Sequence, residues 1–170
     1  MKEYDKAAYR YYSALDLKSL PLISWDIYGP YFDVLCKNYE DVESLRRLSE
    51  DNKWSYSLKF KEALIRKEQV LLITDTQLTI VHATHNIEVM NGYSPNEVIG
   101  KSPKMFQGTQ TDKITTTNIG KAVQAQEPFE AVITNYRKDG STYNCWIKGE
   151  PIFDTNGQLV NFIAYEKEVA

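Results

Sequence analysis

Two short turns in the last third of the chain constrain its fold most strongly. Asp139-Gly140 and Asn156-Gly157 each join two runs that have strand character. Asp-Gly and Asn-Gly are the strongest short-range hairpin signals, because the favoured hairpin turns need positive φ angles. The last third is therefore predicted to be a meander of three antiparallel strands. These strands are expected at 129–137, 141–152 and 158–167.

Cap signals predict several short helices ahead of the meander. A helix at 86–92 ends at Asn91-Gly92, and Ser94 with Glu97 forms a capping box for the next helix. Ser102-Pro103 repeats the arrangement of a cap serine followed by proline. Before these helices, the segments VLLITD and LTIVHAT predict a further hairpin at 70–84.

A longer helix, capped by Thr111 or Asp112, is predicted to reach about Gln126. Five antiparallel strands with short helices gathered on one face make an α+β domain. Such a sheet leaves a cavity between its concave face and the helices, which is a natural small-molecule pocket. The expected core positions of the longer helix are Ile114, Ile119 and Val123.

Before Gln69 the apolar residues recur at helical spacing. One helical face contains Tyr4, Ala8, Tyr11 and Leu15. Gly29-Pro30 interrupts the pattern, so a second short helix is expected after Pro30. A third is expected after Asn38, which we interpret as its N-cap. The predicted division is a helical N-terminal region at 1–55, a linker helix at 56–68 and the α+β domain at 69–170.

Charge and cysteine content argue against several classes of function. The chain of 170 residues has a net charge of −3, so no basic surface for nucleic acid is expected. No apolar run approaches the roughly 20 residues of a membrane span, and the N-terminus has no secretory signal. Cys36 and Cys145 predict no metal site, and we expect reduced thiols in a cytoplasmic protein. No catalytic constellation is visible, so we expect no enzymatic activity.

Four stretches together resemble a PAS domain, and more narrowly its light-oxygen-voltage (LOV) branch. The resemblance covers 69–170 and implies a five-stranded sheet with a role in ligand sensing, protein interaction or signalling. It does not specify the ligand, because PAS folds hold haem, flavins, small acids or nothing. The stretches are NGYSPNEVIGK (Asn91–Lys101), FQGTQTD (Phe106–Asp112), EPFEAVITNYRKDGSTYNCWI (Glu127–Ile147) and PIFDTNGQLVNFIAYEKEV (Pro151–Val169).

The positions at which the LOV branch holds its flavin are only partly kept. Where the branch carries its photoactive cysteine, this chain has Pro103, preceded by Ser102. Proline cannot supply a thiol, so the resemblance implies no cysteinyl-adduct chemistry. The basic residue that meets the flavin phosphate corresponds to Lys104, whereas a second phosphate-binding arginine is replaced by Gly120. The glutamine of the branch is kept as Gln107.

The ring-facing amides of the branch are changed as well. One asparagine is kept as Asn135, but a second is replaced by Cys145, and the final-strand glutamine by Glu166. Each polar edge of a flavin left unpaired costs about 1–3 kcal/mol, so flavin is not favoured. The ligand-pocket candidates are Ser102, Lys104, Gln107, Asn135, Cys145 and Glu166.

Several of the polar residues have simpler interpretations. His82 and His85 are expected to be ordinary strand-end or turn residues. Haem is disfavoured, because in the haem-binding relatives its ligand lies on the long helix, which has no histidine here. Cys145 faces the same side as Tyr143 and is either a small buried thiol or a pocket residue. Glu166 is expected to face solvent, and to contact a ligand only if it points inward.

The sequence therefore favours a non-catalytic sensory PAS module that binds a small molecule or a partner protein. The alternative is a flavin-binding LOV-like photosensor without adduct chemistry. The last predicted strand is followed directly by Ala170, so we expect the signal to pass through the N-terminal helices or to a partner protein. The apolar stripe of the helix at 56–66 either packs on its own domain or meets a second copy, and we favour a homodimer.

Overall fold

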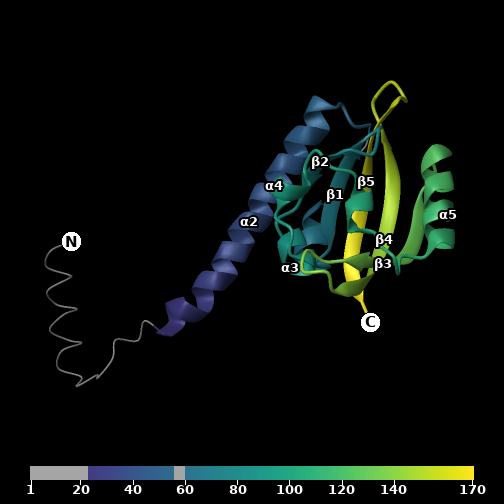
Figure 1. Cartoon of the computed structure of the whole chain (residues 1–170). Coiled ribbons are helices and arrows are strands. Elements are labelled where there is room, and N and C mark those ends of the chain that lie inside the picture. Colours follow the sequence, from purple (N-terminus) through teal and green to yellow (C-terminus); the bar gives the residue numbers. More distant parts are fainter. Residues whose placement is uncertain (1–22, 56–59) are drawn as a thin grey trace, which may run out of the picture. The chain divides into compact units, whose positions relative to one another are not determined.

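The computed structural model describes residues 23–55 and 60–170, apart from the side chains of 23–28 and 31. These residues belong to two units, divided between Leu35 and Cys36. The described part of the first unit is the start of helix α2, Ile23–Asp51. The second unit holds the rest of α2 and the whole sheet (Figure 1).

Five antiparallel strands form one sheet in the order β2-β1-β5-β4-β3. The predicted turns join the last three strands, and their glycines adopt positive φ angles, +87° at Gly140 and +79° at Gly157. The meander and the first hairpin are both present, with bounds that differ from the predicted ones by a few residues. The strands are β1 (Val70–Asp75), β2 (Ile80–Ala83), β3 (Phe129–Tyr136), β4 (Thr142–Phe153) and β5 (Leu159–Val169).

Short helices fill the chain between β2 and β3, and their cap residues act as predicted. Gly92, with φ +79°, ends the first helix, and the Ser94 amide donates to Glu97 Oε2 at 2.9 Å at the start of the second. Asp112 begins the longest of these helices by accepting from the Thr115 amide at 2.7 Å. The elements are α3 (Ile87–Asn91), α4 (Pro95–Val98), the 3-10 turn η2 (Pro103–Phe106) and α5 (Lys113–Gln124).

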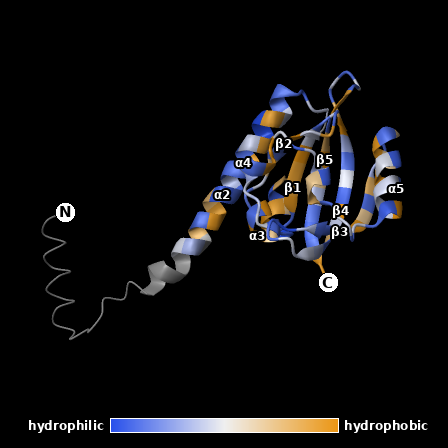
Figure 2. Cartoon of the chain, in the orientation of Figure 1, coloured by the Kyte–Doolittle hydropathy of each residue, from blue (hydrophilic) through white to orange (hydrophobic). Residues whose placement is uncertain are grey.

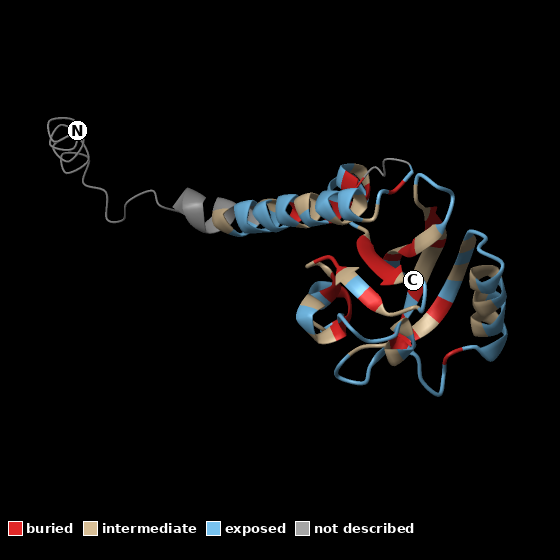
Figure 3. Ribbon diagram, turned by 90° about the horizontal axis from the view of Figure 1, so that it is seen from above, coloured by how far each residue is buried: buried red, intermediate tan, exposed pale blue. Residues whose placement is uncertain are grey.

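Apolar side chains pack on both faces of the sheet. Along β1, Val70 and Leu72 belong to a cluster with α3, α4 and η2, whereas Leu71 and Ile73 belong to a second cluster. The second cluster includes Leu45 of α2. Figure 2 shows most of β1 as hydrophobic, and in Figure 3 the buried residues gather in the strands rather than in α5. The sheet is therefore covered on the face opposite α3–α5 as well, which the sequence did not predict.

Helix α2 corrects the prediction of two short helices in this region. It runs without a break from Ile23 to Asp51, with Pro30 inside it. Asn38 lies in its interior and is buried, so it is not an N-cap. Local cap signals are weak compared with tertiary packing, and Leu45 is fully buried on the sheet. The predicted helical face from Tyr4 to Leu15 lies outside the described residues.

The predicted linker helix is described only from Phe60 onward, where it forms a short π-helical turn, η1 (Glu62–Arg66). Phe60 and Leu64 are buried in the second cluster, so this part of the apolar stripe packs on its own domain. The homodimer therefore stays a prediction without support from this stripe. One predicted core position of α5 is wrong, because Ile114 is 73% exposed.

Candidate ligand pocket

A cavity of about 170 Å³ lies between the sheet and helix α5. Strands β1, β3, β4 and β5 form one wall, and η2 with α5 forms the other. Most of its lining is apolar, which suits the body of an aromatic ligand. The polar lining residues are Thr74, Ser102, Lys104, Gln107, Thr116, Asn135 and Glu166.

The structure brings five of the six candidate residues together at this cavity. Ser102, Lys104 and Gln107 come from η2 and its flanks and are exposed, so they lie at the rim. Ser102 holds the start of η2 by accepting a hydrogen bond from the Lys104 amide at 3.4 Å. Asn135 and Glu166 are each only 3% exposed, so they form the deep polar end of the cavity.

Glu166 points inward, which corrects the expectation that it faces solvent. The β5 register pairs it with Val70 and Ile147, which places it between the apolar side chains of two neighbouring strands. Burial raises the pKa of its carboxyl from 4.5 to about 7. At neutral pH a large share of the molecules therefore holds this carboxyl protonated. It can then both donate a hydrogen bond through its O–H and accept one at its carbonyl oxygen, as a glutamine amide can do with its NH₂ and carbonyl groups.

Cys145, the sixth candidate, lies outside the cavity lining. Its Sγ is 3.8 Å from Oε2 of Glu166, so it stands behind the carboxyl rather than beside a ligand. Burial raises the pKa of the Cys145 thiol far above its usual range, which keeps it protonated and unreactive. As expected, it shares a buried side of β4 with Tyr143, whose ring lies 4.5 Å from the Arg137 guanidinium.

Sequence reasoning missed most of the cavity lining, including four residues on the strands. Thr74, Phe129, Gly149 and Phe162 all line the cavity. The hydroxyl of Thr74 is buried and has no hydrogen-bond partner within the described residues. Every second residue of a strand faces the same side, so alternation from Asn135 and Glu166 finds Phe129 and Phe162. Thr74 and Gly149 lie on β1 and β4, and only the register of the sheet places them.

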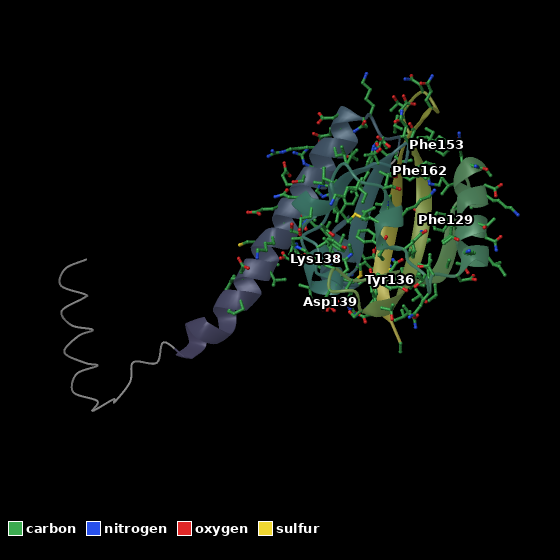
Figure 4. The ribbon with its side chains drawn as sticks, viewed as in Figure 1. Phe129, Tyr136, Lys138, Asp139, Phe153 and Phe162 are labelled. Carbon is green, nitrogen blue, oxygen red and sulfur yellow. The ribbon has the colours of Figure 1, made fainter. Side chains whose placement is uncertain are left out.

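The loop between η2 and α5 is held against β3, which keeps Gln107 at the rim. The Tyr136 hydroxyl accepts a hydrogen bond from the Gln110 amide at 2.9 Å, and Thr111 Oγ1 donates to the Thr134 carbonyl at 2.7 Å. A Cβ at Gly108 would lie 2.5 Å from the Tyr136 ring, so only glycine allows this approach. Figure 4 labels Tyr136 on the sheet.

Each of the two histidines has a structural explanation: His85 contacts an aspartate, and His82 is partly buried. His85 Nδ1 lies 2.7 Å from Oδ2 of Asp41, and the same oxygen accepts from the His85 amide at 2.9 Å. This pair joins α2 to the segment before α3. Burial lowers the pKa of His82. Among the described residues no group of three His, Cys, Asp or Glu side chains is placed to hold a metal ion. No described helix is long and apolar enough to cross a membrane.

Comparison with known families identifies the fold. A family model described as "PAS domain" matches residues 68–169. The chain belongs to the PAS domain family. Its sequence relatives place it in the LOV branch. Phototropin-2 from Oryza sativa subsp. japonica is 33% identical over 127 residues, which cover 73% of this chain and 14% of that protein. Protein TWIN LOV 1 from Arabidopsis thaliana is 31% identical over 140 residues, which cover 80% of this chain and 35% of that protein.

Solved structures give the same assignment for the PAS domain. A LOV domain from a study of a flavin analogue superposes with a TM-score of 0.62 at 28% identity, covering 67% of this chain and 87% of that chain. The LOV domain of the blue-light photoreceptor Aureochrome1 superposes with a TM-score of 0.59 at 28% identity, covering 67% of this chain and 90% of that chain. The Brucella relatives are named blue-light-activated histidine kinases, and this chain spans 21% of their length.

Proposed function

We propose that this chain is a LOV-type sensory module that binds a flavin non-covalently and signals without a cysteinyl adduct. The observation that carries the proposal is the deep polar end of the cavity, where Asn135 and Glu166 stand in otherwise apolar walls. Buried polar groups need hydrogen-bond partners. In the same cavity, Glu166 Oε2 accepts a long 3.8 Å hydrogen bond from Cys145 Sγ, and Thr74 Oγ1 has no partner within the described residues, so this lining favours a ligand with a polar edge. The flavin-binding alternative is thus preferred over an apolar ligand or an empty core.

The donor set fits a flavin ring better than the sequence suggested. The amide of Asn135 can donate and accept, and protonated Glu166 has the same two functions as the glutamine that it replaces. Lys104 at the rim supplies a positive charge for a phosphate-bearing side chain. A bound flavin would supply blue-light absorption and a ring edge that both donates and accepts hydrogen bonds. The chain's own residues hold that edge and exclude water from it.

The same walls support signalling without adduct chemistry. Pro103 lines the cavity where the LOV branch carries its thiol, and none of the described lining residues is a cysteine. The thiol of Cys145 stays protonated behind Glu166. In this proposal Asn135 and Glu166 would hold the polar edge of the ligand, and a signal would start with a rearrangement of their side-chain hydrogen bonds.

A chain of hydrogen bonds leads from the cavity to the segment after α2. Thr74 lines the cavity, and its carbonyl accepts from Asn161 Nδ2 at 3.0 Å. Asn161 Oδ1 in turn accepts from Trp54 Nε1 at 3.0 Å. Trp54 also bridges to Asp154 in the β4–β5 turn. We propose that this contact carries the signal toward the N-terminal helices.

The test is a fluorescence titration of the purified chain with flavin mononucleotide in the dark. We expect saturable binding that Asn135→Ala weakens about tenfold, as expected for the loss of a buried hydrogen bond to the ligand. Asn144→Ala is the matched control, because Asn144 is exposed on the neighbouring strand and should leave binding unchanged. Equal affinity in all three proteins, or no binding to the wild type, contradicts the proposal.

The cavity volume supports a second candidate, a small ligand other than flavin. Ligand pockets commonly measure about 300–1,000 Å³. The cavity of about 170 Å³ is smaller than this range. A compact heteroaromatic ring with a polar edge would fit Asn135 and Glu166 without any movement of the walls. The two candidate ligands differ in one respect: the larger flavin needs the ring of Phe129 in the cavity wall to move, whereas the smaller ligand does not.

A further inference from the structure

Phe129 and Gly149 face each other across the start of β3. They are register partners in the β3–β4 pair, and both line the cavity. Phe129 is the first residue of β3, close to helix α5, as Figure 4 shows. A substitution at either position therefore changes both the sheet edge and the cavity wall.

The ring of Phe129 occupies the space that a side chain at position 149 would need. A Cβ at Gly149 would lie 2.3 Å from Cε1 and Cζ of Phe129 and 3.0 Å from Cδ1. Only glycine permits this position of the ring. An aromatic ring over a cross-strand glycine also stabilises a sheet, so packing alone gives one reason for the pair.

Two observations connect the pair to ligand size. Phe129 is only partly buried, and its ring lies over Gly149 in the cavity wall. On the opposite wall, Gly120 of α5 has no atom within 4 Å of the Cβ position that a side chain would use. The cavity is thus bounded by an aromatic ring over a glycine on one side and by the open backbone at Gly120 on the other.

We propose that Phe129 determines the size of ligand that this cavity accepts. With its ring over Gly149, the cavity admits a one- or two-ring heteroaromatic ligand. A planar three-ring ligand enters only when the Phe129 ring leaves Gly149. The choice of a flavin-like three-ring ligand rests on the proposed function, whereas the size limit itself does not.

The test compares two neutral probes, indole with two fused rings and lumichrome with three, by calorimetric titration of the full chain. Phe129→Val should strengthen lumichrome binding about tenfold, because no ring has to be displaced from its rotamer. Its affinity for indole should stay within about threefold of the wild type, a difference below 1 kcal/mol. Phe153→Val is the matched control, because Phe153 lies outside the cavity lining and should change neither affinity.

A second variant keeps the test decisive if Phe129→Val is poorly folded. Gly149→Ala adds a carbon to the cavity wall, yet it should also strengthen lumichrome binding, because its Cβ displaces the Phe129 ring. Equal lumichrome affinity in wild type and Phe129→Val, or weaker binding in Gly149→Ala, overturns the size limit. If Phe129→Val binds lumichrome more tightly than the wild type but no variant binds flavin mononucleotide, the size limit holds and the flavin proposal fails.

Discussion

At the scale of single residues, the carboxyl of Glu166 matters most for the chemistry of the pocket. The sequence could show that an acidic residue stands in an apolar strand, but not which face it takes. A shift of one residue in strand register reverses every side chain, so its inward position depends on how β5 pairs with its neighbours. Once Glu166 pairs with Val70 and Ile147, burial and the raised pKa follow.

Glu166 should make the stability of the protein fall as pH rises. Its carboxyl titrates near 4.5 when unfolded and at about 7 when folded, so the native state binds more protons between these values. The stabilising proton is fully present below pH 4.5 and is lost as pH rises through about 7. Unfolding by urea from pH 4.5 to 8 should show a decline of about 3 kcal/mol attributable to this group.

Glu166→Gln should remove that decline and leave the variant more stable than the wild type above pH 7. A glutamine reproduces the donor and acceptor of the protonated carboxyl and never ionises. If both proteins show the same dependence of unfolding free energy on pH, Glu166 does not carry a raised pKa.

Trp54→Phe should destabilise the fold by about 1–3 kcal/mol, because it leaves the buried Oδ1 of Asn161 without its donor. Trp146→Phe is the matched control. Its Nε1 donates to Glu130 in an exposed bond, so its loss should cost less than about 1 kcal/mol. Chemical unfolding of both variants measures the difference, and equal losses would refute the role given to Asn161.

At the scale of elements, local sequence signals predicted the hairpins of the sheet and the short helices between β2 and β3 well. The Asp-Gly and Asn-Gly turns and the caps at Ser94 and Asp112 act through neighbouring residues, so they can be read without tertiary information. Helix α2 was not predictable in this way. It continues through Gly29-Pro30 despite that break signal, and its C-terminal part packs on the sheet through Leu45.

The residues of the candidate site follow the same distinction between local sequence signals and tertiary packing. Ser102, Lys104 and Gln107 were found because they lie in one continuous motif next to the cavity. Cys145 was placed in the pocket by resemblance, but it stands one side chain behind it. Thr74, Phe129 and Gly149 lie on strands far apart in sequence, and only the register of the sheet brings them to one wall.

Helix α5 should depend on its N-cap. Asp112→Ala removes the acceptor for the Thr115 amide and should lower the unfolding free energy by about 1 kcal/mol. Asp112→Asn keeps an acceptor at the same place and should lose much less. Hydrogen exchange along 113–124 should speed up in the alanine variant alone. Equal exchange in both variants would show that packing, not the cap, holds this wall of the cavity.

At the scale of the whole molecule, ligand binding in the cavity should change the backbone dynamics of the segment after α2. We expect flavin mononucleotide to slow amide exchange at Trp54 and Ser55, whose amides donate to Ser49 and Phe153 carbonyls. In Trp54→Phe the exchange at Ser55 should no longer respond, because the link through Asn161 is broken. Unchanged exchange at these amides in the flavin-loaded wild type would refute this route.

Flavin binding by this chain can be measured by native mass spectrometry of the purified full chain after incubation with flavin mononucleotide. The measurement reports the bound ligand and the number of chains together. We expect one non-covalent flavin per chain, released on mild activation because no thiol holds it, and we expect the loaded species to be a dimer. A chain that never gains the mass of a flavin would contradict the flavin-binding account, and a flavin that survives denaturation would contradict the absence of adduct chemistry.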